Sequence, residues 1–276
     1  MIIAQLLRSK PLFVFYAVLL SLIWGVLSAQ RLKMFVEMMG YKIGIARCLK
    51  ITFAAFTLNI IIPSKGGDFV KSWSLRDVMP FPQSVGIVIL ERLIDLTLLC
   101  VLAVIGSVVI NDLKMIKISV MVFVVCLGVM IILKKVSSIH SHNRIKQFLK
   151  DVTYATQILL HSTTYFVLIL SISATIWLGS AFQVCLLYLS VGQNVPFTFS
   201  TAVTPIVIFI GLLPVTIGGI GTRDLAFVYF FTDYAPDAAS ISVALLFLLT
   251  RHWAMALIGI PFIGVLRGEK SSIAPD

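Results

Sequence analysis

Charged residues are scarce in this sequence. Only 12% of its 276 residues are Asp, Glu, Lys or Arg, and 59% are hydrophobic, whereas water-soluble domains carry about 25% charged residues. This shortage of charge excludes a water-soluble globular protein and indicates an integral membrane protein. Because a helix needs roughly 20 apolar residues to cross the hydrocarbon layer, we expect transmembrane helices at the apolar runs 12–29, 84–110, 118–133, 165–191 and 238–266.

Motifs for catalysis and cofactor binding are also missing. The sequence has no Ser/His/Asp ordering, no HExxH motif and no P-loop, and His140 and His142 have no carboxylate or cysteine at ligand spacing. The cysteines lie in or beside different apolar runs without CxxC spacing, so we interpret them as packing residues and not as disulfide or metal ligands. They are Cys48, Cys100, Cys126 and Cys185. We therefore expect a protein that is not an enzyme and that has no metal and no cofactor.

The net charge is +10, but the distribution of that charge argues against nucleic acid as a partner. Lys and Arg lie mainly in the short connections between apolar runs, where they set the orientation of membrane helices. The basic loop at about 134–160 and the C-terminus are therefore predicted to be cytoplasmic. The turns 192–199 and 233–237 have no Lys or Arg and are predicted to face outside. The N-terminus then also lies outside with its first helix retained, although Arg8 and Lys10 run against the charge rule.

Two further apolar runs, 51–62 and 202–231, are broken. A full crossing at 51–62 would place one of its two flanking groups of basic residues outside, against the charge rule. We therefore assign both groups to the cytoplasm and predict a re-entrant hairpin between them. The first group is Arg31, Lys33, Lys42, Arg47 and Lys50, and the second is Lys65, Lys71 and Arg76. By the same argument 202–231 is a re-entrant hairpin that enters from outside, and two such hairpins are typical of an inverted repeat.

The two breaks are similar in sequence. Each has a proline, a short polar step, a glycine pair and then an acid. The first contains Asn59, Pro63, Gly66, Gly67 and Asp68, and the second contains Pro214, Gly218, Gly219, Gly221, Arg223 and Asp224. Irregular backbone inside a membrane is tolerated only where protein or water satisfies its polar groups, so a paired break points to an internal cavity. A half-helix at 68–75 would direct its positive dipole end and free N–H groups toward the first break, as a site for an anion.

Three charges near the start of the run 84–110 also point to a cavity. Glu91 and Asp95 are four residues apart and share one face of a helix, with Arg92 beside them. Charges within an apolar span usually face the bundle interior or a wet cavity. The alternative is a purely structural ion pair that locks two helices together.

Other cations are candidate ligands for an anionic group. Arg223 has a planar guanidinium suited to phosphate, and the alternative is that it forms a local pair with Asp224 that caps a helix. Arg251, next to His252, would supply a second cation across the cavity. Lys65 is a further candidate, with a solvated loop charge as its alternative.

The two breaks and the charged group between them form three ordered motifs, at 59–68, 91–95 and 213–224. They resemble the flippase-like membrane domain of lysylphosphatidylglycerol synthases, which also occurs as a stand-alone protein. The resemblance extends from about residue 27 to 261. It implies a lipid translocator: in the fused enzymes this domain moves an aminoacylated phospholipid between leaflets, and stand-alone relatives are suspected of handling lipid-linked or polyprenyl-linked sugars. The sequence differs from the family pattern in three ways. The family usually has one more N-terminal span, its fused members carry a soluble aminoacyl-transferase domain that is not found here, and the family often has Glu where this sequence has Asp224.

We therefore expect one all-α transmembrane domain over residues 1–276, in the cytoplasmic inner membrane of a bacterium or archaeon, with repeat halves at about 43–133 and 163–267. Its expected function is to flip or scramble an anionic lipid, either an (aminoacyl-)phospholipid or a polyprenyl-phosphate-linked sugar. The alternatives are a scaffold for a membrane glycosyltransferase or lipid synthase, and an enzyme acting on polyprenyl phosphate. The expected head-group ligands are Arg92, Arg223, Arg251 and Lys65, supported by Asn59, Asp68, Glu91, Asp95 and Asp224.

Overall fold

The structure is a computed structural model that describes residues 9–111, 113–121, 123, 124, 128, 150, 154–159, 161–212, 216 and 219–267. Every element assigned within these residues is a helix, which confirms the predicted all-α class. The predicted span at 118–133 and the basic loop at about 134–160 lie largely outside the described residues.

Within the described residues, three segments are long and apolar enough to cross a membrane: α2 (Pro11–Met38), α8 (Thr163–Ser190) and Asp237–Gly264. Both α2 and α8 have 28 residues, which gives each about 42 Å at 1.5 Å per residue, against a hydrocarbon thickness of about 30 Å. A fourth helix, α5 (Phe81–Val109), has 29 residues. Four of the predicted spans thus coincide with helices, and the chain is a multi-pass membrane protein.

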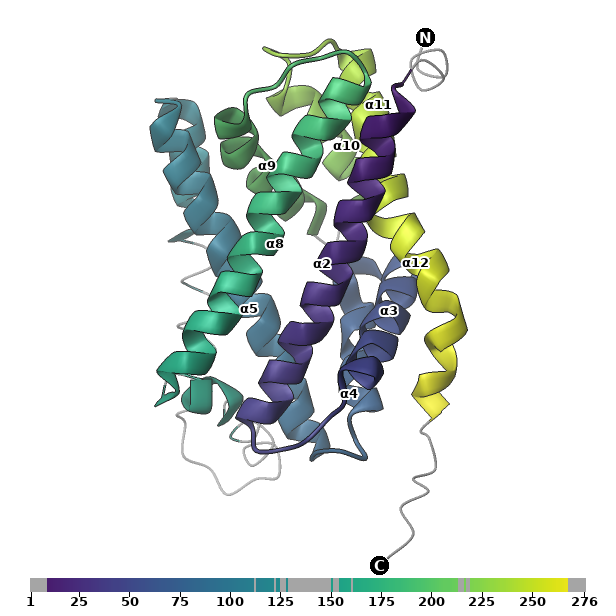
Figure 1. Cartoon of the computed structure of the whole chain (residues 1–276). Helices are drawn as coiled ribbons and strands as arrows, with labels where there is room; N and C mark the ends of the chain where they lie inside the picture. Colours follow the sequence, from purple (N-terminus) through teal and green to yellow (C-terminus); the bar gives the residue numbers. More distant parts are fainter. Residues whose placement is uncertain are drawn as a thin grey trace, which may run out of the picture.

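Small residues bring the helices close together. The two long helices α2 and α8 lie side by side (Figure 1). Where α5 packs on α9 (Phe197–Leu212), a Cβ on Gly106 would lie 2.5 Å from the Cα of Ala202. Such glycines allow membrane helices to approach at backbone distance.

The first broken run forms two short helices. Helix α3 (Ile45–Ile61) ends before Ile62, which is extended at φ −94° and ψ 120° because the residue before a proline is disfavoured in the helical region. A 3₁₀ turn, η1 (Pro63–Asp68), then leads into α4 (Phe69–Ser74), which has only 6 residues.

The second broken run separates α9 from α10 (Thr222–Phe230). Gly219 and Gly221 have φ of 75° and 92°, a left-handed conformation that glycine adopts without steric cost. In Figure 1, α3 and α4 lie toward the lower end of the bundle, whereas α9 and α10 lie toward the upper end.

The last apolar segment is not a uniform α-helix, which the sequence did not predict. Between α11 (Asp237–Phe247) and α12 (Ala254–Gly259) the chain makes a π-helical turn, η3 (Leu248–Trp253), and it ends in a 3₁₀ segment, η4 (Ile260–Arg267). Arg251 and His252 lie on η3. Single π turns inside α-helices are frequent at functional sites.

Two hydrophobic clusters fill the two ends of the bundle. The upper cluster includes Tyr188, Phe199 and Phe231, and the lower one includes Phe35 and Ile87. Cys48, Cys100 and Cys185 are buried and form no disulfide within the described residues, as expected for packing residues. The long helices pass through both clusters, and their middle parts are free to carry polar residues between them.

Candidate functional site

A cavity of about 130 Å³ lies between the two hydrophobic clusters, many times the ~10–15 Å³ that one water needs. Its lining in α2 extends from Ser21 to Arg31, across the middle of that helix, and Trp177 lines it from the middle of α8. Glu91 lies ten residues into α5, about 15 Å from its start. The three charges of α5 are therefore near mid-height and not near the start of the span, as the apolar run had indicated.

Both halves of the chain contribute charged or polar side chains to this cavity. The lining residues of this kind are Ser21, Ser28, Arg31, Asn59, Asp68, Lys71, Glu91, Arg92, Asp95, Trp177, Arg223, Arg251 and His252. Five of them are Lys or Arg and three are Asp or Glu, which leaves an excess of two positive charges with His252 neutral.

One wall of the cavity is an ionic cluster built around Arg31 of α2. Its Nη2 lies 2.6 Å from Glu91 Oε1, and its Nη1 lies 2.6 Å from Asp95 Oδ1 and donates to Ser173 Oγ. Trp177 Nε1 donates to Asp95 Oδ1 at 3.0 Å. The Arg31 side chain is 3% exposed, so α2, α5 and α8 are joined here by buried charges.

Lys71 and Arg92 complete the same cluster. Lys71 Nζ lies 2.9 Å from Glu91 Oε2 and 3.4 Å from Asp68 Oδ1. Arg92 reaches all three acids, at 3.0 Å from Glu91, 3.1 Å from Asp95 and 3.4 Å from Asp68. Three cations therefore meet three carboxylates, which satisfies the requirement that buried charges be paired.

Asp68 lies at the start of α4, where an anion site is expected at 68–75. Its side chain is 3% exposed and makes no capping hydrogen bond to α4. Its Oδ1 accepts a hydrogen bond from Asn59 Nδ2 at 3.2 Å, and its two oxygens pair with Lys71 and Arg92. An anion site at the start of α4 therefore stays a prediction.

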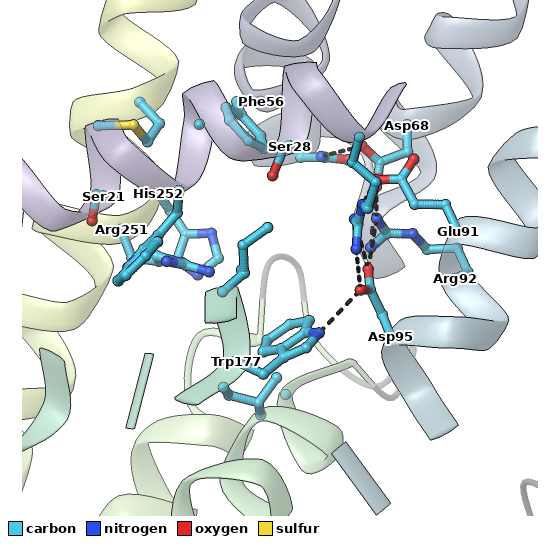
Figure 2. Close-up of a pocket in the computed structure, with 18 of the residues that line it drawn as sticks. Ser21, Ser28, Phe56, Asp68, Glu91, Arg92, Asp95, Trp177, Arg251 and His252 are labelled. Atoms are coloured by element: carbon cyan, nitrogen blue, oxygen red, sulfur yellow. Dashed lines mark hydrogen bonds and ion pairs between the residues drawn. The ribbon is translucent and has the colours of Figure 1, made fainter. Parts of the chain in front are cut away.

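The opposite wall is cationic and less satisfied. Arg223 Nη1 lies 3.0 Å from His252 Nε2, and Arg223 Nη2 lies 3.5 Å from Asp224 Oδ1. Its guanidinium also faces the Phe247 ring, 5.4 Å from the centroid. Within the described part of the chain, Arg251 has no ion pair, and its buried Nη1 has no hydrogen-bond partner. Figure 2 shows Arg251 and His252 across the open cavity from Asp68, Glu91, Arg92 and Asp95.

Seven of the nine predicted head-group and supporting residues meet in this one cavity. They are Asn59, Asp68, Glu91, Arg92, Asp95, Arg223 and Arg251. Asp224 is outside the lining, where its Oδ2 accepts a hydrogen bond from the Gly221 N–H at 2.9 Å and so caps α10. Together with its ion pair to Arg223, this is the local capping pair that the sequence left as the alternative for Arg223, whose role as a phosphate ligand stays a prediction.

The remaining predicted residues have other positions. Gly67 packs against the backbone of Leu58 and Asn59, and Gly219 against that of Gly211, while Gly66 faces Ile62. Pro214 and Gly218 lie outside the described residues, as do the side chains of Lys65 and Pro63.

Sequence reasoning missed Arg31, which it assigned to the cytoplasmic boundary. That assignment is wrong, because α2 continues to Met38 and holds Arg31 about 10 Å inside its end. A usable signal was present: Ser21, Ser28 and Arg31 recur at near-helical spacing and mark a polar face on an otherwise apolar helix. Lys71 was likewise placed among the cytoplasmic basic residues that flank the first break, although its side chain is 1% exposed.

Comparisons with known proteins agree with the architecture. The family model described as the lysylphosphatidylglycerol synthase transmembrane region matches residues 2–259. The UPF0104 membrane protein MJ1595 of Methanocaldococcus jannaschii is 22% identical over 97% of this chain and 89% of the relative. A UPF0104 membrane protein of Archaeoglobus fulgidus is 24% identical over 89% of this chain and 84% of the relative. The chain therefore belongs to the family of lysylphosphatidylglycerol synthase transmembrane regions.

Proposed function

We propose that this protein moves an anionic lipid between the leaflets of the cytoplasmic membrane, with the head group passing through the mid-height cavity and the acyl chains remaining in lipid. The observation that carries the proposal is the arrangement of the two walls: a self-neutralised ionic cluster on one side and the incompletely satisfied Arg223 and Arg251 on the other. Buried cations whose hydrogen-bond donors are not all satisfied are costly. An anionic head group in the cavity offsets that cost.

The three arginines have different parts in this proposal. Arg223 and Arg251 bind the phosphate, because a guanidinium matches phosphate oxygens in charge and geometry. Arg92 is 27% exposed and already shared among three acids, so it stabilises the ionic wall and contacts the head group with its free edge. The acids limit how strongly the cavity retains its cargo.

We further propose that α3 with α4 and α9 with α10 are re-entrant hairpins of an inverted repeat, with halves at about 43–133 and 163–267. Their positions toward opposite ends of the bundle support this (Figure 1). Asn59, Asp68 and Lys71 from the first hairpin and Gly211 and Arg223 from the second line the same cavity. Rocking of one repeat against the other around a fixed central site is a route for alternating access.

The test is reconstitution of the protein into liposomes that contain a fluorescent phospholipid or a fluorescent polyprenyl-phosphate sugar. Dithionite reduces the dye in the outer leaflet, so the rate at which the remaining fluorescence is lost measures lipid movement. Arg251→Gln is expected to lower the rate about tenfold or more, because one charge-assisted hydrogen bond contributes roughly 1.5–3 kcal/mol. Arg76→Gln is the matched control, since Arg76 is exposed and stacks on Trp73, 4.1 Å from its ring centroid, away from the cavity. Equal rates in wild type and Arg251→Gln, or no movement of any lipid by the wild type, reject the proposal.

A further inference from the structure

The acidic and basic side chains of the cavity differ in how completely they are paired. All six carboxylate oxygens of Asp68, Glu91 and Asp95 already have partners. Those of Asp68 face Asn59, Lys71 and Arg92. Those of Glu91 and Asp95 face Arg31, Lys71, Arg92 and Trp177. An ammonium group that entered the cavity would have to displace one of these cations before it found a counter-charge.

Among the residues of the opposite wall that line the cavity, the buried side-chain atoms without a hydrogen-bond partner in the described part of the chain are all donors: Arg223 Nε, Arg223 Nη2 and Arg251 Nη1. Arg223 is 4% exposed, and its Nη2 forms a long ion pair, of 3.5 Å, with Asp224 Oδ1. A guanidinium can only donate, and a buried unsatisfied donor is unfavourable. The group that completes this wall is therefore an acceptor with negative charge, and a phosphate oxygen has both properties.

One feature of the wall favours a phosphate over a carboxylate or a sugar hydroxyl group. The unpaired N–H groups come from two guanidinium groups on different elements, α10 and η3, so one ligand needs several acceptor oxygens to reach both. A phosphate presents such oxygens at tetrahedral angles, and arginine binds it with two parallel hydrogen bonds.

We propose that the head group accepted here is a phosphate mono- or diester that carries net negative charge and no ammonium group. Aminoacylated phospholipids, whose head groups carry an added ammonium, and zwitterionic phospholipids are excluded. This inference rests on the proposed function, because it assumes that the cavity binds the head group of the transported lipid. It specifies which class of lipid that site accepts.

Binding and movement are measured separately, so that failure of the two proposals can be told apart. Full-length protein in detergent is titrated with phosphatidylglycerol, phosphatidic acid, a polyprenyl monophosphate, phosphatidylethanolamine and lysylphosphatidylglycerol, and affinity is read from the shift in melting temperature. The first three are expected to bind about tenfold to a hundredfold more tightly than the last two, the range that one charge-assisted contact supplies. The monoester and diester arms identify which phosphate source is preferred.

Arg251→Glu tests the origin of the selection. It places an unpaired acid on the cationic wall, so the affinity for phosphatidylglycerol is expected to fall by the same factor and that for lysylphosphatidylglycerol to rise. Arg76→Glu makes the same charge change outside the cavity and is expected to keep the wild-type order. If Arg251→Glu does not fold, Arg251→Gln is used, and loss of the preference for anionic lipids is the expected result.

Equal binding of anionic and cationic lipids by the wild type, or binding of none, overturns the inference. So does a preference that Arg251 variants leave unchanged. If anionic lipids bind through Arg251 but no lipid moves in liposomes, the charge selection stands and the transport proposal falls.

Discussion

At the scale of single residues, the ionic wall shows how a membrane interior holds charge. Arg31, Lys71 and Arg92 equal Asp68, Glu91 and Asp95 in number, and every acid touches at least two cations. Pairing reduces the cost of burial without making the cluster a large source of stability, because desolvation offsets the Coulomb attraction. Its contribution is to fix the relative positions of α2, α4 and α5 around the cavity.

Removing Arg31 is therefore expected to be more damaging than removing an exposed arginine. Arg31→Ala leaves Glu91 and Asp95 with fewer counter-charges in a buried site, which costs about 3–5 kcal/mol. Arg47→Ala removes a pair with Asp77 whose side chains are 27% and 33% exposed, and it is expected to cost about 1 kcal/mol or less. Unfolding of both purified variants in detergent measures the difference. Equal stability of the two would show that the Arg31 cluster has no structural role.

Which charges would be buried could be predicted only where the signal was local. Glu91, Arg92 and Asp95 occur within about one helical turn, so the sequence alone predicts that they lie on one side of a helix. Arg31 pairs with acids 60 and 64 positions away, and no pattern near Arg31 specifies that partner. The charge rule for topology then assigned it wrongly, because that rule counts charges near helix ends without knowing where the helix stops.

At the scale of elements, breaks made by proline and glycine were predictable and the π turn was not. Pro63 and the glycines fix the ends of α3 and the start of α10 through backbone sterics, which act between neighbouring residues. The turn Leu248–Trp253 has no proline or glycine. Phe247 of α11 and His252 of the turn contact Arg223 of α10, and α12 packs on α3. Contacts of this kind between distant elements have no local sequence signature.

The contact of α12 with α3 gives a prediction at this scale. A Cβ at Gly259 would overlap the carbonyl oxygen of Phe53 and Thr57 Oγ1, and the Thr57 hydroxyl donates to the Ala256 carbonyl at 2.8 Å across the same interface. Gly259→Ala is expected to force the two helices apart and to lower stability by about 1–3 kcal/mol, as for an overpacked core.

The control for Gly259→Ala is Gly264→Ala. Gly264 is in the following segment, η4, and a Cβ there has nothing within 4 Å. Its substitution is expected to leave the melting temperature unchanged within the error of the measurement. An undiminished melting temperature for Gly259→Ala would mean that α3 and α12 are farther apart in the membrane than described.

At the scale of the whole molecule, a polar region lies between two apolar clusters. Each cluster closes one end of the bundle, and charged groups from both broken segments meet between them. In the proposed transport cycle, the cavity has to open toward one side of the membrane at a time for cargo to exchange. The orientation of the two proposed hairpins decides whether that is possible, because hairpins from opposite faces can open in turn.

Accessibility of single cysteines tests that orientation. In a chain with Cys48, Cys100, Cys126 and Cys185 replaced by Ala or Ser, one cysteine is placed at a time at four exposed positions: Lys42 before α3, Arg76 after α4, Asn194 before α9 and Asp233 after α10. An impermeant maleimide added outside intact cells is expected to label Asn194→Cys and Asp233→Cys, and to label Lys42→Cys and Arg76→Cys only after the membrane is opened. The reason is the charge rule, since basic residues flank the first hairpin and acids flank the end of the second. If Lys42→Cys and Arg76→Cys are labelled from opposite sides, α3 and α4 form a complete crossing and not a hairpin. If the cysteines of both hairpins are labelled from the same side, the inverted repeat is wrong, and the cavity cannot open to each leaflet in turn.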